Sequence, residues 1–353
     1  MEGGARLMMQ KVRLGRTNLR VTRLGWGGIP IQRPGEEEAI SVIKTVIEMG
    51  VDLLDTARAY TNSERRIGLA LEQVKVPVVL SSKSAVRTNK IYEEVHESLR
   101  HLKVKKIPIY HLHNVAVPKD YEKVMAPDGA YEGLKRAKKE GLIDHIGMTS
   151  HSLQMLERAL QDDYFDVIMA CYSFLEPEAG EKVFPLARAR DVGILGMKTF
   201  SGGTIEEAGP ALRFVLSEPD VIPIPGADTI EKARENWKVF AEERSLSQED
   251  RERIEAVRKE SDQEFCRRCD YCQPCPQEIN IQMMMGLKSF VARFGPGADQ
   301  LDWAQRVIEK ARNCEDCGDC LPRCPYQLAI PELIKKNLAW YDSFKAGRKE
   351  KGN

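Results

Sequence analysis

The chain has 353 residues, of which 42% are hydrophobic and 30% charged, and its formal net charge is zero. This is the composition of a globular protein with a sizeable core, long enough for one large domain and an appendage. The balanced charge gives no reason to expect nucleic acid or an anionic membrane as a partner, and without a membrane span or a recognisable signal peptide we expect a cytoplasmic protein.

Short apolar runs alternate with amphipathic stretches over the first 240 or so residues. Residues 11–24 are expected to form a hairpin of two short strands that would cap the following domain. The later expected strands are residues 23–28, 51–54, 76–80, 107–110, 143–148, 165–170, 192–197 and 221–224, and the clearest helices are residues 37–49, 91–102 and 131–140. Gly50 and Gly141 stand just before strands, as residues that end helices do. This alternation predicts parallel strands with helical crossovers.

Eight strand–helix units in about 230 residues predict an α/β fold, a closed (β/α)8 TIM barrel. A doubly wound sheet is the alternative. Its usual mark is G-x-G-x-x-G after the first strand, and the glycines at 25, 27 and 28 do not have that spacing. We therefore favour the barrel.

Eight of the nine cysteines fall between residues 266 and 324. The first run, C-x2-C-x2-C-x2-C-P, consists of Cys266, Cys269, Cys272 and Cys275, and the second, C-x2-C-x2-C-x3-C-P, consists of Cys314, Cys317, Cys320 and Cys324. Three thiolates at such spacing can wrap three irons of one [4Fe–4S] cube, while the fourth iron needs a ligand from elsewhere. The pattern therefore predicts two [4Fe–4S] clusters. A pair of zinc sites and a set of disulfides are the alternatives.

The cysteine segment resembles the two-cluster ferredoxin domain over about 60 residues. It departs from that domain in the spacing of its first run and in the 38 residues that separate the runs. By the resemblance, each run gives its fourth cysteine to the other cluster. One cluster would be held by Cys266, Cys269, Cys272 and Cys324, and the other by Cys314, Cys317, Cys320 and Cys275.

Four polar residues fall near the ends of expected barrel strands, where TIM-barrel chemistry is built. Asp55, Lys83 and His113 each follow an expected strand, and Tyr60 comes five residues after Asp55. When hydride reaches a carbonyl carbon, the oxygen must receive a proton, and tyrosine is a poor acid at its usual pKa of ~10. A neighbouring ammonium stabilises tyrosinate, so Lys83 would make Tyr60 more acidic. Asp55 would hold Lys83, and His113 would orient the carbonyl oxygen. Taken singly, each of these residues is more often a surface charge or a structural residue.

The barrel resembles the aldo-keto reductase superfamily over about residues 11 to 245. The likeness rests on D-T-A-x-x-Y-x-x-S-E at residues 55–64, S-K at 82–83 and L-H-N at 112–114. It implies a TIM barrel, NADP or NAD as cofactor, and a small carbonyl or alcohol compound as substrate. It also implies a catalytic tetrad of Asp55, Tyr60, Lys83 and His113, with Tyr60 as the general acid in reduction.

The resemblance further implies a site for the adenosine end of the cofactor at residues 223–236. The residues that would line it are Gly226, Ala227, Asp228, Lys232 and Asn236, on a loop and the following helix N-terminus, which favours anions. An acid at 228 suits a ribose hydroxyl better than a 2′-phosphate, which argues against a strict preference for NADP.

For the nicotinamide end, the resemblance implies that Thr149 and Ser150 bind the carboxamide. Met197, followed by Lys198, takes the place of the family's stacking aromatic residue, and a thioether can also pack on a ring. Arg58 and Tyr172 would line the substrate pocket.

Two halves of different redox chemistry then share one chain. A nicotinamide transfers two electrons as hydride, each cube transfers one, and no flavin site is recognisable. The clusters would relay electrons to a redox protein partner, serve as structural or docking elements, or belong to a ferredoxin module on a catalytically weak barrel. We expect an NAD(P)-dependent oxidoreductase that acts on CH–OH or C=O groups, with an electron-transfer or partner-docking protein as the alternative.

These signals divide the chain into four parts. Residues 1–245 would form the barrel, 246–261 a charged helical connector, 262–335 a small α-helical iron–sulfur domain of the ferredoxin type, and 336–353 a polar C-terminal tail.

Overall fold

The structure is a computed structural model that describes residues 11–261, 263–294 and 298–350. The chain divides into two compact units at Ile254, inside helix α11 (Gln248–Ser261). The predicted connector is thus helical. Ser247 precedes α11 and forms a reciprocal cap with Asp250, whose backbone N–H donates to Ser247 Oγ (3.0 Å) while the Ser247 N–H donates to the Asp250 carboxylate (2.9 Å).

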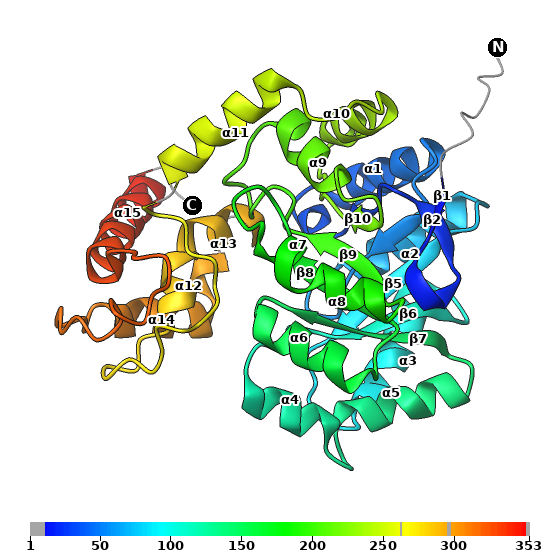
Figure 1. Ribbon diagram of the computed structural model, residues 1–353, viewed down its shortest axis with the longest axis horizontal. Helices are drawn as coiled ribbons and strands as arrows, with labels where there is room; N and C mark the ends of the chain where they lie inside the picture. The colour runs from blue at the N-terminus through cyan, green and yellow to red at the C-terminus, as the bar shows by residue number, and fades with distance from the viewer. Residues whose placement is uncertain (1–10, 262, 295–297, 351–353) are drawn as a thin grey trace. The chain divides into compact units, whose positions relative to one another are not determined.

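Eight parallel strands form the barrel of the first unit (Figure 1). In chain order they are β3 (Trp26–Gly27), β4 (Leu53–Asp55), β5 (Val79–Ser84), β6 (Ile107–Leu112), β7 (Ile143–Ser150), β8 (Val167–Cys171), β9 (Gly193–Met197) and β10 (Val221–Pro223). Each strand pairs with its successor, and a parallel bridge from Gly27 to Gly226 brings the chain after β10 back to β3. The predicted TIM barrel is confirmed, and the doubly wound alternative is wrong.

Helices cover the outside of the strands. They are α1 (Glu36–Glu48), α2 (Ser63–Gln73), α3 (Ile91–Leu102), α4 (Pro118–Met125), α5 (Ala130–Lys139), α6 (Leu153–Asp162), α7 (Glu178–Lys182), α8 (Phe184–Ala189), α9 (Ala208–Leu216) and α10 (Ile230–Ala241). In α3 the residues Ile91, Val95, Leu99 and Leu102 recur every three or four positions and are buried, which is the pattern of a helix with one apolar face. Gly50 has φ +100° after α1, a left-handed conformation that favours glycine.

The N-terminal hairpin is confirmed as well. Strand β1 (Lys11–Arg13) pairs antiparallel with β2 (Arg20–Thr22) around a short 3-10 turn. Arg13 forms an ion pair with Asp191 (2.6 Å) and Arg16 with Asp163 (2.8 Å). Because these acids precede β9 and β8, the hairpin covers the amino ends of the strands, opposite the end where β4 and β6 finish.

All eight barrel strands differ by a few residues from their expected limits, and in β5 and β7 the difference bears on the site. β5 starts at Val79 rather than at residue 76 and continues to Ser84, so Lys83 lies inside the strand and not after it. β7 continues to Ser150. Apolar runs underestimate these strands because the carboxyl end of the barrel interior is polar, and buried hydroxyl and ammonium groups there hydrogen bond to one another.

The second unit is a small helical domain, as predicted. It contains α12 (Ile281–Met285), α13 (Leu287–Phe294), α14 (Asp302–Ala311) and α15 (Ile330–Glu350), which surround a core separate from the barrel. The prediction of a tail at 336–353 is wrong for residues 336–350, which continue α15. Ile334, Leu338 and Tyr341 bring an apolar stripe to this helix, although the surrounding charges dominate the sequence pattern.

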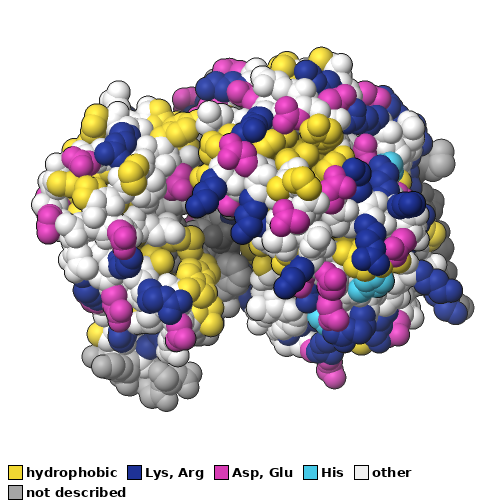
Figure 2. All heavy atoms as spheres, turned by 90° about the horizontal axis from the view of Figure 1, so that it is seen from below, with side chains coloured by type: hydrophobic (Ala, Val, Ile, Leu, Met, Phe, Trp, Pro, Cys, Tyr) yellow, Lys and Arg dark blue, Asp and Glu magenta, His cyan; other side chains and the backbone are white. Residues whose placement is uncertain are grey.

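The surface agrees with the balanced composition. The face in Figure 2 carries Lys and Arg side chains interspersed with Asp and Glu side chains. No helix in the described ranges combines the length and the apolar character needed to cross a membrane.

Candidate functional site

Asp55 and Lys83 form an ion pair inside the barrel. Lys83 Nζ lies 2.5 Å from Asp55 Oδ2 and 2.7 Å from the carbonyl oxygen of Thr56, and the two residues are 2% and 3% exposed. Burial alone would lower the pKa of Lys83, but the charge of Asp55 and an interaction with Tyr60 outweigh burial, so this pKa is raised. Lys83 is therefore an ammonium ion whose three protons meet Asp55, Thr56 and Tyr60.

Tyr60 and His113 lie beside this pair and are partly exposed. Their rings meet edge to face, with centroids 5.9 Å apart and an interplanar angle of 87°. Lys83 Nζ is 4.9 Å from the centroid of the Tyr60 ring. The four residues predicted as a tetrad thus come together at the carboxyl ends of β4, β5 and β6. A buried ion pair lies below, and a phenol and an imidazole lie within reach of solvent.

His113 is neutral at ordinary pH. Burial lowers its pKa to about 3, and the positive charges of Lys83, Arg87 and Lys198 act in the same direction. Its backbone N–H donates to the Ser84 carbonyl (3.0 Å). Arg87 holds the chain beyond the ring by donating to the carbonyl of His113 (2.7 Å). A neutral, fixed imidazole can donate a hydrogen bond to an oxygen without carrying charge into the site.

The remaining residues of the 55–64 motif hold the loop that carries Tyr60. Ser63 Oγ donates to the Gly28 carbonyl (2.9 Å) and also contacts Thr56 Oγ1 (2.9 Å). Glu64 is 2% exposed and accepts hydrogen bonds from Ser82 (2.7 Å) and Arg58 (2.7 Å). The motif therefore contains residues of the tetrad, Asp55 and Tyr60, and residues that hold the loop, such as Ser63 and Glu64. The sequence alone does not distinguish the two groups.

The two expected pocket residues have other partners. Arg58 is held by Glu64 and, at 3.2 Å, by Glu94. Tyr172 packs against Phe184 and Phe214, and its hydroxyl donates to Glu218 (3.3 Å). Tyr172 therefore belongs to the helical layer around the barrel, and its expected place in a substrate pocket is wrong.

Thr149 and Ser150 end β7 beside the tetrad. Thr149 Oγ1 accepts the backbone N–H of Asn114 (2.8 Å), and Ser150 Oγ accepts that of Ser152 (2.9 Å). Both hydroxyl groups act as acceptors in these bonds, so their protons can still be donated to an amide oxygen. This chemistry fits a nicotinamide carboxamide.

The loop after β9 adds three more groups. Met197 ends the strand, and Lys198 is near enough to His113 to lower the pKa of that imidazole. Thr199 was not singled out from the sequence. Its hydroxyl is buried and has no hydrogen-bond partner within the described ranges. Since buried hydroxyls are normally paired, this one fits a site for a polar ligand.

The residues expected at the adenosine end form a separate group at the start of α10. Thr229 caps this helix by accepting the backbone N–H of Lys232 (3.3 Å). The Asp228 carboxylate lies between two cations, 2.9 Å from Arg33 and 3.0 Å from Lys232. Arg33 was not expected here, because it comes from a loop about 195 residues earlier in the sequence. A helix N-terminus favours a phosphate group, and here the Asp228 carboxylate offsets part of the positive charge that Arg33 and Lys232 bring to it.

The other three residues of that group are less informative. Ala227 and Asn236 are buried, and Gly226 faces Pro30 so closely that an added Cβ would lie 2.4 Å from Pro30 Cγ. Packing therefore already explains a glycine at 226.

All nine cysteines are free, so the disulfide alternative is wrong. Burial raises the pKa of Cys266 to about 11, and neighbouring Cys269 and Cys324 act in the same direction. Burial also raises the pKa of Cys320, with further contributions from Cys314, Cys317 and Cys275. Cys324 thus lies near the first run and Cys275 near the second, as the crosswise assignment requires. Two runs of four cysteines supply the eight thiolates that two [4Fe–4S] clusters need, although no group of three within the described residues is arranged to hold a single metal ion.

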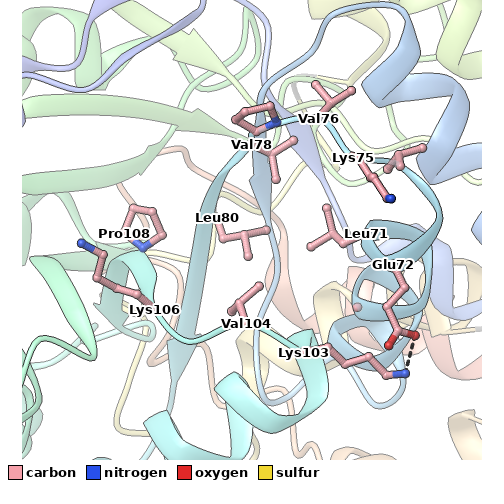
Figure 3. Close-up of a pocket in the computed structure, with 13 residues that line it drawn as sticks. Leu71, Glu72, Lys75, Val76, Val78, Leu80, Lys103, Val104, Lys106 and Pro108 are labelled. Atoms are coloured by element: carbon pink, nitrogen blue, oxygen red, sulfur yellow. Dashed lines mark hydrogen bonds and ion pairs between the residues drawn. The ribbon is translucent and has the colours of Figure 1, made fainter.

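Two hollows of about 490 Å³ each lie elsewhere in the barrel unit. Figure 3 shows the first, where Leu71, Val78, Leu80 and Val104 line the floor and Lys103 reaches Glu72 at the edge. It lies against the amino ends of β5 and β6, opposite the tetrad. The second is lined by charged residues around α9 and α11. Neither contains a tetrad residue.

Comparisons with known proteins agree with this architecture. Residues 22–210 match the Aldo/keto reductase family, and residues 265–329 match a 4Fe-4S dicluster domain. An uncharacterised oxidoreductase of Schizosaccharomyces pombe, C215.11c, is 26% identical over 256 residues, which cover 62% of this chain and 81% of that protein.

Two solved structures extend the comparison. The holo form of aldo-keto reductase AKR11C1 from Bacillus halodurans aligns with a TM-score of 0.60 and 25% identity, covering 70% of this chain and 96% of that one. An aldo-keto reductase from Klebsiella pneumoniae in complex with NADPH aligns with a TM-score of 0.59 at 18% identity, covering 71% of this chain and 95% of that one, and shows the shared fold.

Proposed function

The chain belongs to the aldo/keto reductase family, and from that premise we propose that it reduces an aldehyde or ketone with NADPH or NADH, or catalyses the reverse alcohol oxidation. The observation that carries the proposal is the arrangement of Asp55, Lys83, Tyr60 and His113 at one mouth of the barrel.

Tyr60 is the proton donor in this proposal. When bound, a reduced nicotinamide would supply hydride to the carbonyl carbon, and the charge that develops on the oxygen would require a proton. The Lys83 ammonium hydrogen bonds to Tyr60 and favours the tyrosinate that remains after proton transfer. His113 is neutral and donates a hydrogen bond that positions the carbonyl oxygen. Asp55 keeps Lys83 charged and in place.

Two groups of residues would hold the cofactor. Thr149, Ser150 and Thr199 offer hydroxyl groups near the tetrad for the nicotinamide carboxamide and its neighbouring atoms. Arg33, Lys232 and the N-terminus of α10 would hold the phosphate of the adenosine half. Met197 and Lys198 would lie along the nicotinamide ring. A relative of the same fold was solved with NADPH, which supports this class of cofactor.

The eight clustered cysteines would hold two [4Fe–4S] clusters, which supply one-electron transfer when bound. Cys317 is exposed, which favours electron exchange with a redox protein partner over a purely structural role. Free thiols also suit a reducing compartment, in line with the predicted cytoplasmic location.

Tyr60→Phe tests the proposed reduction. NADPH and NADH oxidation would be followed with a panel of small aldehydes and ketones. We expect the variant to retain cofactor binding and to lose about 10²- to 10⁴-fold in kcat, the contribution of a positioned general acid. Tyr164→Phe is the matched control, because Tyr164 is 51% exposed and distant in the chain from every tetrad residue. Equal rates for Tyr60→Phe and wild type, or no turnover by wild type with any carbonyl, would defeat the proposal.

A further inference from the structure

A second polar pair lies in the barrel interior, directly below the ion pair. Ser81 Oγ donates to Asp55 Oδ1 at 2.8 Å, on the side of the carboxylate that Lys83 does not use. His111 Nε2 lies 3.0 Å from the same Ser81 oxygen. Ser81 and His111 are both fully buried. The interior thus contains a continuous chain from His111 through Ser81 and Asp55 to Lys83.

The donors and acceptors of these side chains fix the direction of each hydrogen bond in the series. Ser81 has one hydroxyl proton and donates it in the hydrogen bond to Asp55, so its oxygen must accept a hydrogen bond from His111 Nε2–H. Burial and the charge of Lys83 lower the pKa of His111 well below its usual value, so the ring is neutral. His111 is therefore the tautomer with its proton on Nε2, and Nδ1 carries none. Both hydrogen bonds therefore run toward Asp55: His111 donates to Ser81, and Ser81 donates to Asp55.

This arrangement has a structural cost. His111 Nδ1 is buried without a hydrogen-bond partner among the described residues, although a buried polar atom normally has one. The ring also needs space that Gly147 on β7 leaves open, since a Cβ there would lie 2.1 Å from Nδ1. An apolar side chain at 111 would avoid both the unpaired acceptor and the desolvation of an imidazole. A histidine below the ion pair therefore indicates a role beyond packing.

We propose that Ser81 and His111 are positioning residues for the carbonyl reduction inferred above. By holding Asp55 Oδ1, they keep Oδ2 directed at Lys83 and leave the third proton of Lys83 directed at Tyr60. Neither residue touches the substrate. Their action passes through Asp55 and Lys83 to the phenol that donates the proton. The inference rests on the proposed function and extends it to the layer below the tetrad.

Four variants test this role: Ser81→Ala, His111→Leu, the double variant, and His111→Gln. Ser81→Ala removes the hydrogen bond to Asp55 Oδ1, and His111→Leu removes the donor that orients the Ser81 hydroxyl. Because small misplacements of catalytic groups slow turnover, we expect each variant to lower kcat by about tenfold or more. KM and the Kd of the cofactor should change less than about twofold. The double variant should be no slower than either single variant, because both substitutions interrupt the same chain. His111→Gln restores an N–H near the position of Nε2 and should recover most of kcat.

A solvent deuterium isotope effect gives a readout that a packing role would not change. Weaker orientation of Tyr60 makes proton transfer more rate-limiting, so the isotope effect on kcat should rise in Ser81→Ala and return toward wild type in His111→Gln. Gly147→Ala adds an independent test, since its methyl group would displace the His111 ring and should reproduce the kcat loss of His111→Leu.

The outcomes separate this inference from the proposed function. If Tyr60→Phe is inactive while His111→Leu keeps wild-type kcat, the positioning role is wrong and the reductase proposal stands. The role is also wrong if the two single losses multiply in the double variant. If His111→Gln and His111→Leu lose kcat and thermal stability alike, His111 is a packing residue. If the wild-type enzyme turns over no carbonyl compound, the reductase proposal and the positioning role both lose their basis.

Discussion

Lys83 Nζ and Asp55 Oδ2 are 2.5 Å apart at a position where both residues are almost completely excluded from solvent. A buried pair of this kind stabilises the fold little in itself, but leaving one partner alone is costly, by about 3–5 kcal/mol. Lys83→Met should therefore destabilise the barrel by about 3 kcal/mol, and Asp55→Asn combined with Lys83→Met should recover more than half of that loss.

Calorimetry and hydrogen exchange of β4 and β5 amides would measure these differences. The exposed pair of Lys106 and Asp144, 3.0 Å apart, provides the control, because Lys106→Met should change stability little. A double variant that is less stable than Lys83→Met would show that the charges are not energetically coupled.

His113 should not titrate near neutral pH. Its pKa is lowered to about 3 in the folded protein, against about 6.5 in an unfolded chain. Unfolding therefore takes up a proton between these values, so this residue contributes stability that is fully present above pH ~6.5 and is lost as pH falls toward 3. In histidine-labelled protein we expect the His113 ring signal, assigned with His113→Gln, to stay in its neutral position from pH 5 to 8. A midpoint near 6.5 would contradict a neutral imidazole with a lowered pKa.

Asp228 should control the choice between the two nicotinamide cofactors. Its carboxylate neutralises Arg33 and Lys232, 2.9 and 3.0 Å away. Asp228→Asn frees these cations for a 2′-phosphate, so NADPH should bind about tenfold more tightly, the equivalent of one charge-assisted contact, while the affinity for NADH changes little. Titration calorimetry gives both Kd values. Arg33→Gln should shift the preference in the opposite direction, and an equal change for both cofactors would place the 2′-phosphate elsewhere.

The fourth cysteine of each run should serve the other run's cluster. Cys275 contributes to the raised pKa of Cys320, and Cys324 contributes to the raised pKa values of Cys266 and Cys269. Anaerobically purified protein should contain about eight iron atoms, the content of two [4Fe–4S] clusters. The paramagnetic resonance signal lost in Cys275→Ser should be the one lost in Cys320→Ser.

Two further variants complete that test. Cys324→Ser should lose the same signal as Cys269→Ser, whereas Cys171→Ser in β8 should keep both signals and the full iron content. Loss of the Cys269 signal in Cys275→Ser would mean that each run ligates its own cluster.

The sequence alone determined what depends on neighbours along the chain. Periodic apolar residues gave most strands and helices, as in α3, and thiol spacing gave the iron–sulfur interpretation. The ordered motif from Asp55 to His113 indicated the family. These are local signals, because strand and helix periods and ligand loops span a few residues.

Tertiary structure decided what depends on barrel closure. Arg33 reaches Asp228 because the chain after β10 returns to β3, and His111 fits because β7 has a glycine beside it. Ser81 is a buried partner of Asp55, a role that no apolar pattern on β5 reveals. In α15, the many charged residues made the apolar stripe hard to recognise from the sequence. Interactions between residues far apart in sequence depend on how strands pair and on which way side chains face. Local patterns along the sequence reveal neither of these.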